Sequence, residues 1–170
     1  VVYNTSSFDS LEALSLMRGK VDVYLADFKY ASALEAGKLS HAPRYPEIAL
    51  AAIEEMVAQV PVWEEDDEGL LLKGVIVRHL VLPGRVEESK RALATLHDRF
   101  GGSVRLSIMS QYTPLASGLE RYGLAGRVTE EEYEEVLDYA DSLGVEDYFW
   151  QQGDAAQESF VPEFNGEGVR

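Results

Sequence analysis

Short runs rich in β-branched residues alternate along the chain with amphipathic segments of helical length. This alternation constrains the fold more than any other feature of the sequence. The expected strands lie at residues 1–4, 21–25, 74–82, 104–109 and 147–151. Strands separated by helices of 10–15 residues predict repeated βαβ units and a parallel sheet. We therefore expect an α/β fold with parallel strands and covering helices; a doubly wound sheet and a slice of a barrel are equally compatible with the pattern.

Helix boundaries follow from local signals. Asp9-Ser10-Leu11-Glu12 is read as a capping box that opens a helix ending before Gly19, and Thr129-Glu130-Glu131-Glu132 as a second capping box that opens a helix reaching Leu143. Pro46 suits the first turn of a helix that reaches about Val60. A further helix is expected at 86–100, before a Gly-Gly pair.

Residues 1–170 are expected to form a single domain, because 46% hydrophobic content is enough for one core and no internal repeat is evident. An acidic turn between two short apolar runs predicts a hairpin insertion at about 62–72. The chain closes with a Gly-rich, acidic tail at about 152–170.

The formal charge of −15 argues against nucleic acid and anionic membranes as partners, because both attract clustered Lys and Arg. No apolar run approaches the roughly twenty residues that span a bilayer, and no signal-peptide pattern opens the chain, so we expect a cytoplasmic protein. There is no cysteine, and the three histidines (His41, His79 and His97) do not have metal-ligand spacing.

Polar residues stand where the predicted strands end, which is where working residues gather in βα proteins. Asn4 closes the first strand, and Asp27 and Lys29 follow the second. Asp27 and Lys29 stand two residues apart, so we expect them to share a face with Val23 and Leu25. They can clamp the hydroxyls and carboxylate of a ligand, or form an ordinary strand-end ion pair.

Arg78 lies inside a nearly continuous apolar strand, where an unpaired guanidinium is costly. On one face of that strand it can bind a carboxylate with two hydrogen bonds, or pair with a local acid such as Asp27. His79 points the opposite way and is read as a hydrogen-bonded core histidine.

Two further strand ends carry candidate residues. Leu82-Pro83-Gly84 is a rigid turn that lets backbone approach a flat ligand, or an ordinary βα loop. Gln111 and Tyr112 follow the next strand and can reach the same edge of the sheet, although each residue alone is a weak signal.

Several of these segments together resemble radical SAM proteins, in the branch related to the activating enzymes of pyruvate formate-lyase. The similarity covers essentially the whole chain. Only the segment from Arg78 to Gly84 is distinctive by itself. The similarity rests on that segment together with six others: Tyr3-Asn4-Thr5-Ser6, Asp27-Phe28-Lys29-Tyr30, Pro43 to Pro46, Met109-Ser110-Gln111-Tyr112, Gln151-Gln152, and Ser159-Phe160-Val161-Pro162.

The resemblance implies a partial (β/α)6 TIM-like barrel, of which this chain would hold roughly the second half. Family members bind S-adenosylmethionine across the barrel mouth and use a reduced [4Fe-4S] cluster to form a 5′-deoxyadenosyl radical. In the activating enzymes this radical removes a hydrogen atom from a backbone glycine of a partner, a glycyl radical enzyme.

Carried over by position, the resemblance assigns S-adenosylmethionine contacts to several strand-end residues. Asp27 and Lys29 match a segment on the ribose side, Arg78 matches an arginine near the carboxylate, and Leu80 to Pro83 match a strand end near adenine. Asn4, Gln111 and Tyr112 complete the expected cofactor-binding set. Tyr112 lies near where the activating enzymes have a histidine, and Tyr3 lies about where they have an aspartate.

The family binds its cluster through a Cys-x-x-x-Cys-x-x-Cys loop, and this chain has no cysteine. We therefore expect a C-terminal fragment that is inactive alone and contains no catalytic residue or metal ligand. An exposed strand edge would then let the fragment self-associate. The alternatives are a cysteine-free binding or scaffold domain with the same fold, and an unrelated α/β enzyme that uses Asp27, Lys29 and Arg78.

Overall fold

The computed structural model describes residues 1–114, 117–145 and 147–150, which form one sheet flanked by helices. Five strands run parallel in the spatial order β1-β2-β4-β5-β6. Their bounds are β1 (Val2–Thr5), β2 (Val23–Asp27), β4 (Leu71–Leu80), β5 (Arg105–Met109) and β6 (Phe149–Trp150). The short β3 (Glu64–Glu65) pairs antiparallel with β4. The predicted α/β class with a parallel sheet is confirmed.

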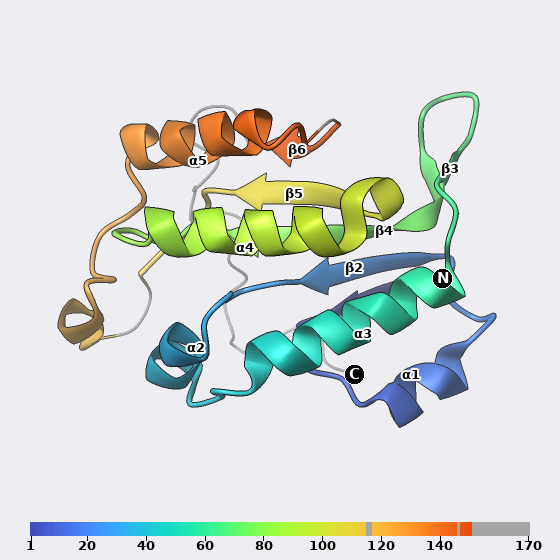
Figure 1. Ribbon diagram of the computed structural model, residues 1–170, viewed down its shortest axis with the longest axis horizontal. Coiled ribbons are helices and arrows are strands. Elements are labelled where there is room, and N and C mark those ends of the chain that lie inside the picture. Colours follow the sequence, from blue (N-terminus) through green and yellow to red (C-terminus); the bar gives the residue numbers. More distant parts are fainter. Residues whose placement is uncertain (115–116, 146, 151–170) are drawn as a thin grey trace, which may run out of the picture.

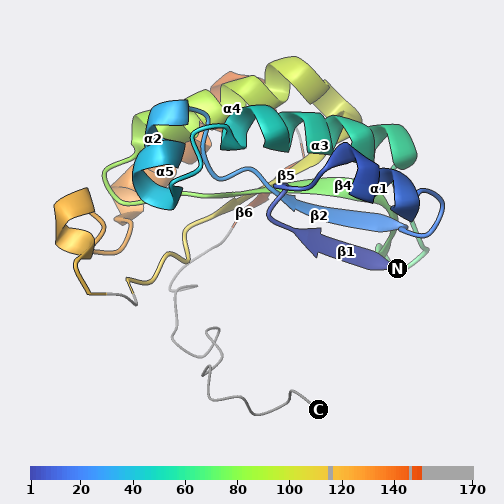
Figure 2. The ribbon, with the colours of Figure 1, turned by 90° about the horizontal axis from the view of Figure 1, so that it is seen from below.

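The five α-helices lie on one face of the sheet, and no α-helix of the described chain covers the other face (Figures 1 and 2). The helices are α1 (Leu11–Met17), α2 (Ala33–Ser40), α3 (Tyr45–Gln59), α4 (Val86–Phe100) and α5 (Glu130–Ser142). Two 3-10 turns, η1 (Gly101–Ser103) and η2 (Leu119–Tyr122), follow α4 and β5. We call the uncovered side of the sheet the open face.

The core fills the space between the helices and the covered face of the sheet. Side chains alternate along each strand, so every second residue of β2, β4 and β5 points into this layer. The fully buried members of the strands and helices include Tyr24, Ala26, Val75, Val77, Ile108, Ala49, Ile53, Met56, Leu93, Leu96 and Val136. Leu25 and Ile76, which alternate with these strand residues, are only partly buried because they face the open side.

Most predicted boundaries agree with the structure to within one to three residues. The helix predicted at 86–100 has those bounds as α4, and both hydrogen bonds of the capping box at Thr129 and Glu132 are present. The capping box predicted at Asp9 is wrong, because Ser10 caps α1 and Asp9 instead accepts hydrogen bonds from Tyr3 and Thr5. Of the final strand predicted at 147–151, only Phe149–Trp150 forms, and residue 151 lies outside the described residues.

The predicted hairpin insertion is present, and it folds back onto the open face. Glu64 pairs with Lys73 across the β3–β4 turn. Trp63, which precedes β3, packs over Gly74 so closely that a Cβ on Gly74 would lie 2.6 Å from the Trp63 ring. The Arg105 guanidinium lies 5.3 Å from the centre of the same ring. The indole therefore covers the open face near the amino ends of the strands.

Within the described residues, the sheet is open, with β1 and β6 at its two edges. The expected half-barrel therefore remains a prediction. None of the helices in this part of the chain has both the length and the apolar character needed to cross a membrane.

Candidate functional site

The candidate site lies on the open face at the carboxyl ends of β1, β2 and β4. Strand register brings its residues together: Asp27 is paired with Arg78, and Arg78 with Ser107 on β5. Asn4 is paired with Leu25, two residues before Asp27. Parallel strands end at the same edge of a sheet, so residues separated by up to 74 positions in sequence become neighbours.

Arg78 is the centre of this charged cluster. Its Nε donates to Asp27 Oδ1 at 2.9 Å, and its Nη2 lies 2.6 Å from the same oxygen. Nη2 also donates to Asn4 Oδ1 at 2.6 Å. The Lys29 ammonium lies 2.9 Å from Asp27 Oδ2, on the other side of the carboxylate. The ion pair that the sequence offered as an alternative is therefore formed.

Solvent reaches this cluster to different degrees. The Asp27 side chain is 17% exposed and that of Arg78 is 25% exposed, whereas Lys29 is 44% exposed. Two cations share one carboxylate, which leaves donors for a second anion, and such donors suit the carboxylate of a small ligand.

Apolar residues of the open face lie on both sides of Arg78 along the strands, with Leu25 beside Ile76 before it and Leu80 beside Met109 after it, and we call them the apolar strip. Leu25, Ile76, Leu80 and Met109 point to this side and remain partly exposed. A ligand that joins a charged group to a flat apolar group can therefore contact both kinds of surface. Leu80 lies on this strip, but the side chain of Pro83 is buried, so Pro83 can take part only through its backbone.

His79 occupies the covered face, as the sequence predicts. Its ring is 2% exposed; Nδ1 lies 2.8 Å from the carbonyl oxygen of Phe28, and Nε2 lies 2.9 Å from Ser89 Oγ. Burial lowers the pKa of this imidazole. The ring links the end of β2 to α4 and has no access to the open face.

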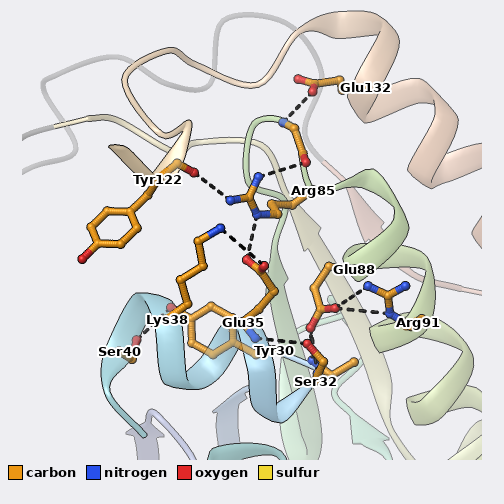
Figure 3. Close-up of polar contacts among 12 residues, drawn as sticks. Tyr30, Ser32, Glu35, Lys38, Ser40, Arg85, Glu88, Arg91, Tyr122 and Glu132 are labelled. Carbon is orange, nitrogen blue, oxygen red and sulfur yellow. Dashed lines mark hydrogen bonds and ion pairs between the residues drawn. The ribbon is translucent and has the colours of Figure 1, made fainter. Parts of the chain in front are cut away.

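Behind the edge of the site, Arg85 and Glu88 hold the loops that follow β2 and β4 (Figure 3). Arg85 Nε donates to Glu35 Oε2 at 2.8 Å, and its Nη2 donates to the carbonyl oxygen of Tyr122 at 2.7 Å. The amide of Gly84 donates to Glu132 Oε1 at 2.7 Å, so this amide of the predicted ligand-binding turn already has a protein partner.

Glu88 is nearly buried beside this network, and Figure 3 shows its carboxylate between Ser32 and Arg91. It accepts from the amides of Ala31 and Ser32 at 2.9 and 2.7 Å, and from Arg91 Nη2 at 2.8 Å. Burial alone would raise the pKa of Glu88, but these hydrogen bonds outweigh it and hold the pKa below its usual value. The segment that carries Lys29 is thereby fixed to α4.

Gln111 and Tyr112 are not brought into the charged cluster. The Tyr112 hydroxyl donates to the carbonyl oxygen of Leu124 at 2.9 Å, and burial raises the pKa of this phenol. The amide nitrogen of Gln111 lies 3.8 Å from the Met109 sulfur, on an exposed side chain. Of the eight predicted residues, the structure unites Asn4, Asp27, Lys29 and Arg78, with Leu80 beside them.

One supporting residue, Tyr45, was missed from the sequence, whereas Ser7 belongs to the polar segment Asn4-Thr5-Ser6-Ser7 expected at the end of the first strand. Tyr45 contacts the ends of both β1 and β2 through its hydroxyl. Ser7, just after β1, has a left-handed backbone (φ 61°) and a buried hydroxyl without a hydrogen-bond partner among the described residues. No local pattern distinguishes Tyr45 from any other buried aromatic residue, so the sequence carried no signal for its role.

No family model matches the chain. A curated relative, described as the uncharacterized protein MJ0674 of Methanocaldococcus jannaschii, is 27% identical over 146 residues, which cover 86% of this chain and 39% of that protein. The chain thus spans about two fifths of the length of the curated relative it matches. That description states no activity, so the case for a function comes from the geometry of the site and from the resemblance of its segments.

Proposed function

We propose that this chain supplies the S-adenosylmethionine-binding part of a radical SAM enzyme similar to the activating enzymes of glycyl radical enzymes. One observation carries the proposal. Asn4, Asp27, Lys29 and Arg78, which the resemblance assigns to the cofactor, converge from three strand ends on the one face that no α-helix of the described chain covers. The partner would be a glycyl radical enzyme or another protein substrate.

The side chains offer complementary groups to each part of this ligand. The Asp27 carboxylate can accept hydrogen bonds from ribose hydroxyls, and Arg78 with Lys29 can pair with the ligand carboxylate. Leu25, Ile76 and Leu80 offer an apolar surface to adenine. When bound, S-adenosylmethionine would supply the 5′-deoxyadenosyl group; the protein residues would hold it in place.

The iron–sulfur cluster does not fit the residues of this chain. The sequence has no cysteine, and the described residues contain no group of three or more His, Asp or Glu side chains able to hold a metal ion. Thiolates are the usual ligands of such clusters. In this proposal the ligands come from residues outside the present sequence, and the chain by itself generates no radical.

A second candidate is a cysteine-free binding or scaffold domain. The observation in its favour is that Arg78 already has protein partners, Asp27 and Asn4, which satisfy its Nε and Nη2 without a ligand. In that reading the cluster joins the ends of β1, β2 and β4, and the open face packs against protein.

Ligand titration followed by NMR distinguishes the two candidates. The chain would be titrated with S-adenosylmethionine to millimolar concentration, with S-adenosylhomocysteine, adenosine and methionine in parallel. We expect saturable shifts at the amides of Asp27 and Arg78, and an affinity about 10- to 100-fold lower in Asp27→Asn and Arg78→Lys, since one charge-assisted hydrogen bond contributes about 1.5–3 kcal/mol.

Arg99→Lys is the matched control, because Arg99 pairs with Glu54 on the exposed helix surface, away from the open face. This variant should bind like the wild type. A folded wild-type chain whose Asp27 and Arg78 amides do not respond to millimolar S-adenosylmethionine would overturn the cofactor proposal and favour the scaffold.

A further inference from the structure

The hydroxyl of Tyr45 lies directly behind the charged cluster and joins the two strand ends that carry it. Tyr45 Oη is 2.9 Å from the carbonyl oxygen of Ser6, just beyond β1, and 2.9 Å from that of Asp27, the last residue of β2. It also accepts the amide hydrogen of Lys29 at 3.0 Å. One side chain on α3 therefore contacts the backbone of two residues of the charged cluster, Asp27 and Lys29, and of Ser6 just after β1.

Packing leaves this hydroxyl little freedom to move. Tyr45 is 4% exposed, and its ring stacks on Phe8 and Phe28 at centroid distances of 6.0 and 6.5 Å. Tyr30 meets it edge-on at 5.6 Å. The two carbonyl oxygens share the single hydrogen of the phenol, so both strand ends are held close to the same oxygen atom.

We infer that Tyr45 is a positioning residue that sets the spacing between Asn4 and Asp27, so that Arg78 can contact both at once. The inference rests on the proposed function, since it assigns Tyr45 a part in holding the ligand-binding residues. It goes beyond that function because Tyr45 itself stays buried and contacts no ligand.

The geometry at Arg78 explains why the spacing matters. Its Nη2 donates to Asn4 on β1 at 2.6 Å while its Nε donates to Asp27 on β2 at 2.9 Å. Hydrogen bonds weaken once donor and acceptor separate beyond about 3.2 Å, so a shift of well under 1 Å between the two strand ends removes one of the contacts. Among the described strands β1 has a single neighbour, β2, so its position depends on such cross-links.

Tyr45→Phe removes the hydroxyl and keeps the ring. Tyr30→Phe is a matched control, because it removes a hydroxyl from the same aromatic cluster, where Tyr30 Oη lies 2.8 Å from Ser40 Oγ on α2. The readout is the NMR signal and the hydrogen-exchange rate of the Arg78 Nε–H group, measured without ligand. Unfolding curves of Tyr45→Phe and Tyr30→Phe are compared as well, so that a general loss of stability can be told apart from a local change at Arg78.

We expect Tyr45→Phe to shift the Arg78 Nε–H signal and to speed its exchange severalfold, while Tyr30→Phe leaves both unchanged. In the Asn4→Ala background the effect of Tyr45→Phe should shrink, because the link through Asn4 is already lost. Equal effects of the two hydroxyl deletions, or no effect of Tyr45→Phe on Arg78, would overturn the positioning role.

Ligand titration of the same variants separates this inference from the proposed function. Tyr45→Phe should weaken S-adenosylmethionine binding several-fold in a chain whose stability matches that of Tyr30→Phe. If the wild type binds no S-adenosylmethionine, the proposed function fails. The Arg78 signal still decides whether Tyr45 positions the charged cluster.

Discussion

The neighbouring residues His79 and Arg78 of β4 show that a polar side chain is buried on one face of the sheet and partly exposed on the other. His79 points into the covered face, is 2% exposed, and has one partner on each ring nitrogen. Arg78 points to the open face, keeps a quarter of its side chain exposed, and shares the carboxylate of Asp27 with Lys29. On the covered face, the His79 ring is held between two buried partners. On the open face, Arg78 and Lys29 share one carboxylate that borders solvent, so a ligand can reach these charges.

This difference separates the residues that stabilise the fold from those available for function. The partners of His79 are buried and cannot be replaced by water, so losing the ring leaves them unsatisfied. The partners of Arg78 border solvent, and Asp27 would retain Lys29 if Arg78 were removed. We therefore expect mutations on the two faces to affect different properties of the protein.

The largest effect is expected from His79→Leu. This change leaves the Phe28 carbonyl and the Ser89 hydroxyl without their buried partner, at a cost of about 2–4 kcal/mol in the free energy of unfolding. Arg78→Leu should cost about 1 kcal/mol or less, because its ion pair is partly solvated. Urea unfolding of both variants measures the contrast, and equal losses would show that the two faces do not differ in this way.

A smaller effect should follow from Gly74→Ala, which tests the packing of the hairpin on the open face. The new Cβ would lie 2.6 Å from Trp63, so the indole or β4 must shift, at a cost of about 1–3 kcal/mol. Thermal unfolding and Trp fluorescence should both change. Gly102→Ala is the control, because a Cβ there meets nothing within 4 Å; a Gly74→Ala protein as stable as this control would show that Trp63 does not pack there.

The smallest effect is expected from protonating His79 in mild acid. Its pKa in the folded protein is lowered from 6.5, so below about pH 6.5 the unfolded chain binds more protons than the folded one. Stability should therefore fall as the pH drops from 7 to about 5.5. The facing groups are Ser89, the Phe28 carbonyl and Glu88, whose lowered pKa keeps it ionised throughout this window.

Unfolding midpoints across this pH range measure the effect. In His79→Leu this part of the pH dependence should disappear. A variant that carries both His41→Gln and His97→Gln should retain it. If the double variant lost the dependence instead, the titrating group would be one of the two more accessible histidines.

Local signals in the sequence predicted much of the fold. The runs that became β2 and β4, the helix at 86–100 and the capping box at Thr129 each depend on neighbouring residues, which periodicity and capping patterns report directly. The helix α2 was missed, although Ser32 caps it with Glu35 at the third helical position, because the segment is short and contains Gly37. That spacing was a usable signal.

The site was predictable only in part. Alternation placed Arg78 and His79 on opposite faces and named Asp27 as an ionic partner, and the structure agrees. It could not show that Gly84 bonds Glu132, that Tyr112 turns to Leu124, or that Tyr45 joins two strand ends. Those contacts depend on how distant segments pack, and packing has no local signature.

The parallel register of the sheet has a consequence for how the protein folds. Arg78 contacts Asp27 across 51 positions of sequence and Asn4 across 74, with α2, α3 and the hairpin formed in between. Contacts this distant are made late, because the chain must first close long loops. Helices such as α4 can form early from local interactions, but the charged cluster exists only once β1, β2 and β4 are aligned. Recovery of the Arg78 environment is therefore a sensitive marker of complete refolding.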